Sequence, residues 1–346
     1  MTCQNPNIQQ SEPSTRDFMI PDSDDYYFLV CDYSQVERRL MGGLSHDAGI
    51  VEPFRKDPEM DSHIQTYANM FGVPYENVDG KMRKLGKQLN FGTAYSLGAK
   101  SLASSIWGND DDDHKMMAQE LLDTYWLSAK DLKKYLDDKR NLAEETFSAS
   151  TFFGRRRFIH KLYAASEEKD KRKKSQLIAS GRREAGNLPV QGTAADILKM
   201  ALVRLQNGFR SRGLGEDKAR QVMNIHDEVV YQIHKSIHPW MATAIMREAM
   251  EIDLSEEGFP PLYIGANVGY SWHDGKEEYL EAPVLLMDRQ CAWAWEQYRN
   301  GLPVDGFEYL EDPRKFWEEE ITNYAAEQVF KEYHLGYKKD GVVTKI

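Results

Sequence analysis

The stretch that decides the fold is residues 26–32, YYFLVCD, in which a short apolar run leads directly into an acid. A run of this kind, rich in aromatic and aliphatic residues, predicts a buried strand. Residues 220–234 predict two more strands around a tight turn, and residues 259–272 predict a strand that closes the same sheet. Helical patterns cover residues 60–146 and 180–206, so two strand-rich blocks flank a long helical insertion. The predicted fold class is α+β, with a sheet as its platform and a helical subdomain.

The composition is that of a globular chain of about two domains, with 346 residues of which 41% are hydrophobic. No apolar run approaches the ~20 residues that a membrane span needs, and Met1 leads into polar residues rather than a secretory signal. The cysteines at 3, 31 and 291 lie far apart and form no CxxC pair. We therefore expect a cytoplasmic protein without a disulfide framework or a cysteine zinc site.

The net charge of −11 argues, taken alone, against a nucleic-acid partner, because neutralising phosphates takes clustered Lys and Arg. The cations are concentrated, however: residues 150–183 carry 11 of them against 3 acids, and residues 81–100 carry 5 against none. Within the first cluster, GRRRF at 154–158 flanks three arginines with aromatic residues, which favours phosphate contact. The run at 167–174 fits a solvated face equally well.

The segment 81–98 predicts a helix with two different faces. Arg83, Lys87, Phe91 and Tyr95 are spaced by four, so they follow one face of a helix. An ordinary surface helix explains charged residues opposite leucines, but it does not explain two aromatic rings on the cationic stripe. The stripe instead favours a ligand with phosphates at one end and a stacking base at the other, such as a nucleoside triphosphate.

Carboxylates lie at the ends of two predicted strands. Asp32 follows the first strand, and Asp227 and Glu228 lie at the tip of the predicted hairpin. Each group alone fits a solvated turn acid. Together, on adjacent strands, two carboxylates could share two Mg²⁺ ions about 3.5–4 Å apart, since Mg²⁺ takes its remaining ligands from water and phosphate oxygens.

Several ordered motifs resemble the family A DNA polymerases, the group of bacterial DNA polymerase I and related phage enzymes. The resemblance covers about Asn5 to Glu278, and the motifs that carry it are DYSQVE at 32–37, the stripe from Arg83 to Tyr95, IHDE at 225–228, DSHIQTYANMFGVP at 61–74, FFGRRRF at 152–158 and NLPVQGTAADILK at 187–199. Two positions depart from the family pattern: Ser96 stands where a glycine is usual, and Arg38 where an apolar residue is usual.

The resemblance implies a polymerase palm, an antiparallel sheet with helices, with a helical fingers insertion, and no thumb or exonuclease in this chain. The implied domains are a first palm segment at 1–60, fingers at 61–180, a second palm segment at 181–278, and an extension at 279–346. The extension carries a predicted helix from about 313 to 333, and it is a possible docking region for a partner.

The resemblance also implies roles for individual residues. Two Mg²⁺ ions, or Mn²⁺ as a substitute, would be held by Asp32, Asp227 and the backbone carbonyl of Tyr33. The implied catalytic residues are Asp32, Asp227, Glu228 and Lys87, the last as proton donor to the leaving pyrophosphate. The implied nucleotide-binding residues are Arg83, Lys87, Phe91, Tyr95, His63, Gln35 and Glu37, of which Glu37 excludes a ribose 2′-OH. The implied DNA-binding residues are Asn7, Arg155, Arg156, Arg157, Arg182, Arg183, Asn187, Gln191 and His226; Gln35 is also implied to touch primer–template.

The implied function is that of a DNA-templated DNA polymerase subunit, which adds deoxynucleoside triphosphates to a primer 3′-OH on primer–template DNA. NPNIQQ at 5–10 stands, in relatives, after a thumb and an exonuclease. We therefore expect a second polypeptide that carries a thumb, with or without an exonuclease, as in a split phage-type polymerase; a truncated fragment is the alternative. Rival functions are a catalytically idle DNA-binding subunit, a polymerase that makes or copies RNA, and a free-standing nuclease.

Overall fold

The computed structural model describes residues 13–94, 97–237 and 239–272 of the chain. The described residues divide into two compact units, one within 13–34, 198–252 and 263–272, and the other within 35–197 and 253–262. We call them unit 1 and unit 2. Three sequence predictions lie outside the described residues: Asn7, Tyr95 with the neighbouring Ser96, and the extension at 279–346.

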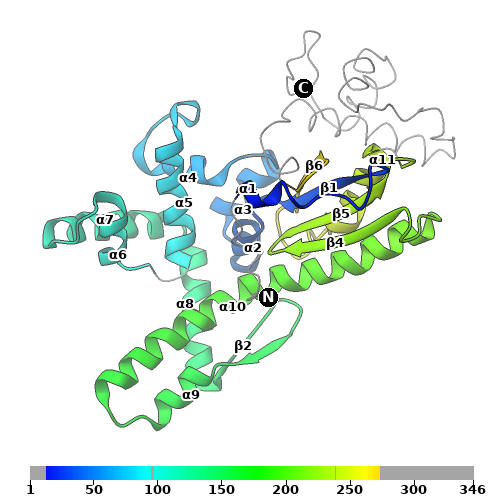
Figure 1. Ribbon diagram of the computed structural model, residues 1–346. Coiled ribbons are helices and arrows are strands. Elements are labelled where there is room, and N and C mark those ends of the chain that lie inside the picture. The colour runs from blue at the N-terminus through cyan, green and yellow to red at the C-terminus, as the bar shows by residue number, and fades with distance from the viewer. Residues whose placement is uncertain (1–12, 95–96, 238, 273–346) are drawn as a thin grey trace. The chain divides into compact units, whose positions relative to one another are not determined.

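Unit 1 is built on a four-stranded antiparallel sheet (Figure 1). Its strands, in spatial order, are β4 (Ala219–Ile225), β5 (Glu228–His234), β1 (Tyr26–Tyr33) and β6 (Ile264–Gly269). The predicted first strand, the predicted hairpin and the predicted closing strand are thereby confirmed. The closing strand is shorter than 259–272 because Pro260 and Pro261 precede it, and a proline has no N–H to donate to a sheet.

The two faces of this sheet differ because side chains alternate along each strand. One face packs against helices: the Tyr33 hydroxyl donates to the Met250 carbonyl at 2.7 Å, and the Phe209 ring stacks on Tyr231 with centroids 5.1 Å apart. These contacts involve α11 (Pro239–Met250) and the last turns of α10 (Lys171–Ser211). The opposite face carries a small apolar cluster formed by Phe28, Val30, Val230 and Trp272. The short helix α1 (Pro13–Arg16) also belongs to unit 1.

Unit 2 is mainly helical and confirms the predicted insertion. Its helices are α2 (Val36–Ser45), α3 (Ala48–Lys56), α4 (Ser62–Phe71), η2 (Tyr75–Asn77), α5 (Gly80–Ala94), α6 (Ala99–Trp107), α7 (Asp112–Ser128), α8 (Lys130–Thr146), α9 (His160–Glu167) and most of α10. Gly72 and Gly108 end α4 and α6 with φ near +65° and +68°, a conformation that glycine adopts freely. None of the described helices is long and apolar enough to cross a membrane.

Two parts of unit 2 go beyond the sequence predictions. Helix α10 begins at 171 rather than 180, because Asp170 caps it by accepting the Lys173 backbone N–H at 2.7 Å. Residues 148–158 form a small hairpin of β2 (Ser148–Ser150) and β3 (Arg156–Phe158).

Helices α2 and α3 pack within unit 2, although the sequence assigns them to the first palm segment. Asp47, the cap of α3, joins this helix to α8. Its carboxylate accepts the backbone N–H of Gly49 at 3.0 Å and that of Leu132 at 3.2 Å. The Arg38 guanidinium donates to the Tyr125 hydroxyl at 2.9 Å and joins α2 to α7. The compact units therefore divide after residue 34, while the predicted domain boundaries stay a prediction.

Candidate active site

The acids of unit 1 gather at one edge of its sheet. Asp32 on β1 lies directly opposite Glu228 on β5, and Ile225 on β4 pairs with the same glutamate. His226 and Asp227 alone therefore form the turn between β4 and β5. His226 adopts a left-handed φ of 57°, which histidine tolerates better than most residues. We call Asp32, Asp227 and Glu228 the acidic edge.

The members of the acidic edge differ in their access to solvent. Asp32 is exposed and Asp227 is half-buried, whereas Glu228 is 2% exposed and accepts a hydrogen bond from the Trp272 indole N–H at 2.8 Å. The two aspartates therefore present carboxylates to solvent from one rigid edge. Glu228 is held inward by a residue 44 positions further along the chain.

The donor set of the acidic edge fits a magnesium ion. Within the part of the chain that the structure describes, no three His, Cys, Asp or Glu side chains form a closed metal cage. One or two carboxylates, such as those of Asp32 and Asp227, are nevertheless the protein ligands that Mg²⁺ prefers when water and phosphate oxygens complete its shell. The Tyr33 side chain points elsewhere: burial raises the pKa of its phenol, which stays protonated and donates to Met250.

In unit 2, the described part of α5 has the predicted two faces. Leu89 is fully buried, while Lys87 is exposed. The Lys87 ammonium lies 5.9 Å from the centre of the Phe91 ring, and that ring lies 5.3 Å from the His63 ring. The Lys87 ammonium and the Phe91 ring therefore lie side by side, which is the arrangement that phosphate contact and base stacking require.

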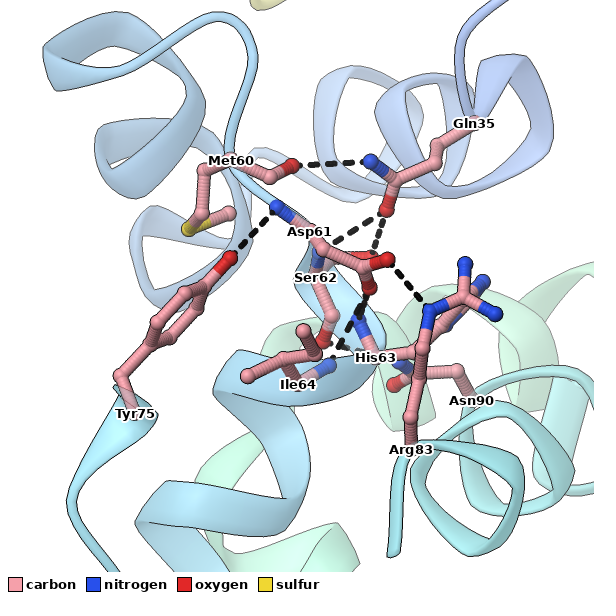
Figure 2. A network of polar contacts seen from close by, with 9 residues as sticks. All are labelled: Gln35, Met60, Asp61, Ser62, His63, Ile64, Tyr75, Arg83 and Asn90. Carbon is pink, nitrogen blue, oxygen red and sulfur yellow. Dashed lines mark hydrogen bonds and ion pairs between the residues drawn. The ribbon is translucent and has the colours of Figure 1, made fainter. Parts of the chain in front are cut away.

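Arg83 on α5 is fixed by a carboxylate at the start of α4 (Figure 2). Its Nε donates to Asp61 Oδ2 at 2.6 Å, while Asp61 Oδ1 accepts the backbone N–H groups of His63 at 2.8 Å and Ile64 at 3.2 Å. Burial raises the pKa of Asp61, but the hydrogen bonds from Arg83 and the α4 backbone outweigh it and hold the pKa below its usual range. Asp61 is thus ionised at neutral pH.

His63 is buried and uncharged at neutral pH. Asn90 donates to the Ser62 carbonyl at 3.2 Å and accepts from Thr66 at 3.0 Å, which fixes its amide so that it donates to His63 Nδ1 at 3.0 Å. The proton of the ring therefore sits on Nε2. Burial, with help from the nearby Arg83 and Lys87 charges, lowers the pKa of His63 to about 4 although Asp61 acts against it. His63 is therefore a neutral N–H donor and not a cation at neutral pH.

Gln35 and Glu37, at the start of α2, are both engaged within unit 2. The backbone of Gln35 is left-handed, with φ 52°. Its amide donates to the Met60 carbonyl at 2.8 Å and accepts from the backbone and the hydroxyl of Ser62 at 2.9 and 2.6 Å. Glu37 accepts from the Gln191 amide at 3.4 Å. The predicted contacts of these side chains with nucleotide or DNA stay predictions.

Most of the arginines predicted to bind DNA are paired with acids. Arg155 donates to Asp196 at 2.7 Å, Arg157 pairs with Glu184 at 2.9 Å, and Arg182 pairs with Glu144. The remaining predicted contacts from this region are Arg156, which donates to the Ser148 hydroxyl at 2.9 Å, Arg183, which is exposed, and Asn187, which is half-buried.

The motifs of both units converge on one family. A family model described as DNA polymerase family A matches residues 1–274. The chain belongs to DNA polymerase family A. The α+β fold expected from that resemblance is confirmed, with an antiparallel sheet in unit 1 and a helical insertion in unit 2.

Similar proteins of family A include bacterial DNA polymerases I. The chain is 33% identical to that of Pseudomonas aeruginosa over 252 residues, or 72% of this chain and 25% of the relative. It is 32% identical to the thermostable DNA polymerase I of Thermus aquaticus over 255 residues, or 73% and 28%. The chain thus spans about a quarter of the length of these curated relatives.

A solved family A structure is similar in fold: the POL domain of Pol1 from M. smegmatis, in complex with a DNA primer-template and dNTP. The TM-score is 0.68 at 27% identity, over 80% of this chain and 46% of that chain.

Three site residues escaped the sequence reasoning: Asp61, Asn90 and Trp272. Asp61 precedes a helical pattern as a helix cap should, and this signal was available. The other two are defined by partners distant in sequence.

Proposed function

We propose that this chain is a DNA-templated DNA polymerase that adds deoxynucleotides to a primer 3′-OH. The observation that carries the proposal is the acidic edge, where Asp32 stands opposite Glu228 in register and Asp227 occupies the adjoining turn, in a family A chain. A scaffold without activity would have no need of two solvent-accessible carboxylates on a rigid edge. This favours catalysis over the idle DNA-binding subunit.

In unit 1, Asp32 and Asp227, with the Tyr33 carbonyl, would hold two Mg²⁺ ions. When bound, these ions make the primer hydroxyl more acidic and neutralise charge on the triphosphate. The strands of unit 1 hold Asp32 and Asp227 in place before the reaction. Little reorganisation is therefore needed as the primer 3′-oxygen attacks the α-phosphate and pyrophosphate leaves.

In unit 2, α5 would receive the nucleotide. Arg83 and Lys87 neutralise the triphosphate, and Phe91 contacts the sugar and base. Lys87 is exposed and beside the Phe91 ring, so it can also donate the proton that the leaving pyrophosphate takes up. His63, which is neutral, contributes an N–H rather than a charge.

Primer extension with Mg²⁺ tests this function. Asp32→Ala and Asp227→Ala should each lower incorporation at least about a hundredfold, since each removes a ligand on which several kcal/mol of charge stabilisation depends. Asp217→Ala is the matched control, because it removes an exposed carboxylate just before β4 in the same unit. Incorporation that survives the first two substitutions would contradict the two-metal role.

Sugar selection gives a second test. Glu37 lies in the first turn of α2 and would stand where a ribose 2′-OH intrudes. Glu37→Ala should reduce the preference for deoxynucleotides over ribonucleotides, measured as the ratio of kcat/KM values. An unchanged ratio would contradict this role and reopen the RNA-synthesising alternative.

The second polypeptide expected from the sequence, with a thumb and with or without an exonuclease, stays a prediction. Copurification of a second polymerase-like chain would support it. Processive primer extension by the purified chain alone would contradict it.

A further inference from the structure

The loop at the start of α4 holds Asp61 from several sides (Figure 2). The Gln35 side-chain amide binds the backbone on both sides of Asp61. It donates to the Met60 carbonyl and accepts from the Ser62 backbone N–H. The Asp61 backbone N–H donates to the Tyr75 hydroxyl at 3.0 Å. Its own Oδ1 is held by two N–H groups of α4. Asp61 is therefore a carboxylate whose position is fixed before any ligand arrives.

Asp61 binds one edge of the Arg83 guanidinium and leaves the other open. The contact is through Nε, at 2.6 Å. Within residues 13–94, 97–237 and 239–272, that guanidinium makes no other hydrogen bond or ion pair, and the side chain is 43% exposed. Its two terminal nitrogens form the flat fork that binds two phosphate oxygens at once.

A long arginine side chain loses much rotamer freedom when it binds a ligand. A fixed carboxylate at its Nε edge removes that freedom in advance, so that less affinity is lost on binding. A carboxylate beside a phosphate site can also have the opposite effect, because its negative charge competes with the phosphate for the arginine. The geometry favours the first effect, because Asp61 engages the Nε edge and not the fork.

We propose that Asp61 is a positioning residue that holds Arg83 in the orientation in which its fork receives the triphosphate of an incoming nucleotide. The inference rests on the proposed function, which assigns Arg83 to that triphosphate. Asp61 would act through Arg83, and the Gln35 amide would act one step further away by fixing the loop that carries Asp61.

Asp61→Asn separates positioning from capping. Asparagine caps helices as well as aspartate does, so α4 keeps its cap, but its second polar atom is an N–H donor that Arg83 cannot use. Asp79→Asn is the matched control. Asp79 is exposed and caps α5 through the backbone N–H groups of Lys81 and Met82 at 2.9 and 2.8 Å, so the control removes the same charge from the same kind of cap. Equal melting temperatures of the two variants would establish that both caps persist.

The assay is equilibrium binding of dATP with Mg²⁺ to the full chain, followed by steady-state primer extension. Asp61→Asn should weaken dATP binding about three- to tenfold, the factor that corresponds to ordering one rotamer-rich side chain. KM should rise by the same factor while kcat changes less than about twofold, because Arg83 would be mispositioned in the ground state and the transition state alike. Asp79→Asn should change neither. In an Arg83→Ala background, Asp61→Asn should have no further effect.

Three results would overturn the inference. They are equal binding by the two asparagine variants, tighter binding by Asp61→Asn, and an Asp61→Asn effect that persists without Arg83. Tighter binding would identify Asp61 as a competitor of the phosphate. A wild-type chain that binds no dATP would overturn the proposed function itself, and the inference with it.

Discussion

Replacing Trp272 by Phe removes the donor that holds Glu228 at the acidic edge. The indole N–H donates to the carboxylate at 2.8 Å, and the two side chains are 1% and 2% exposed. Water therefore cannot take the place of the donor without opening the structure. Phenylalanine keeps an aromatic ring in the same apolar cluster, beside Phe28 and Val30.

The expected loss has two parts. A hydrogen bond to a charged group stabilises the folded state by about 1.5–3 kcal/mol. The missing part of the larger ring leaves a small cavity that costs about 1 kcal/mol. Trp272→Phe should therefore lower the free energy of unfolding by about 3 kcal/mol.

Equilibrium urea unfolding, with a double-mutant cycle, measures this loss. Glu228→Gln keeps the shape of the acceptor and removes its charge, so Trp272→Phe should cost about 1–2 kcal/mol less in that background. Trp126→Phe is the control, because Trp126 is half-buried and its indole N–H has no hydrogen-bond partner among the described residues. Costs that agree within about 0.5 kcal/mol in the two backgrounds would refute the reasoning.

Three further predictions concern unit 2. Because the pKa of His63 is lowered to about 4 on folding, the unfolded chain takes up a proton below pH 6.5 that the folded chain does not. The free energy of unfolding should thus be unaffected by His63 above pH 6.5 and should fall by at most about 3 kcal/mol as the pH drops to 4. His63→Gln should make the free energy of unfolding depend less on pH across that range. Gly43→Ala would place a Cβ 2.1 Å from the Phe259 ring and should cost about 1–3 kcal/mol, a cost that Phe259→Leu should relieve; equal cost in both backgrounds would exclude the clash. Asp47→Ala should cost about 2 kcal/mol in thermal unfolding, since it removes both the α3 cap and the acceptor of the Leu132 N–H; Asp47→Asn should restore only the cap, because its NH2 group replaces one of the two accepting oxygens.

The fold was largely predictable because its signals are local. The apolar run before Asp32 and the short turn at 226–227 are each contained in a few residues. In an antiparallel sheet, the apolar pattern and the turn leave few possible registers for two adjacent strands. The observed register places Asp32 opposite Glu228. The extent of α10 was less predictable, because its first turn depends on the Asp170 cap rather than on apolar periodicity.

The state of the polar side chains could not be predicted from the sequence. Gln35 carries a motif position, but nothing local indicates that its amide binds a loop 25 residues further on. Asp61 precedes a helix in a recognisable way, yet its partner Arg83 is set by how α4 packs on α5. The burial that makes His63 neutral is likewise a property of tertiary packing. Motifs thus indicate which residues matter, and packing decides the charge and direction with which they act.

The ion pairs of three arginines within residues 150–183 have a consequence for the salt dependence of the proposed DNA binding. A cation that neutralises a phosphate releases ions condensed on the duplex, and the logarithm of affinity falls with the logarithm of salt in proportion to the phosphates neutralised. An arginine that must leave an aspartate or glutamate to reach DNA returns a bare carboxylate to the solvent, which recruits ions again. The arginines in this position are Arg155, Arg157 and Arg182. The slope of log affinity against log salt should therefore be shallower than the eleven cations of residues 150–183 would give if each neutralised one phosphate.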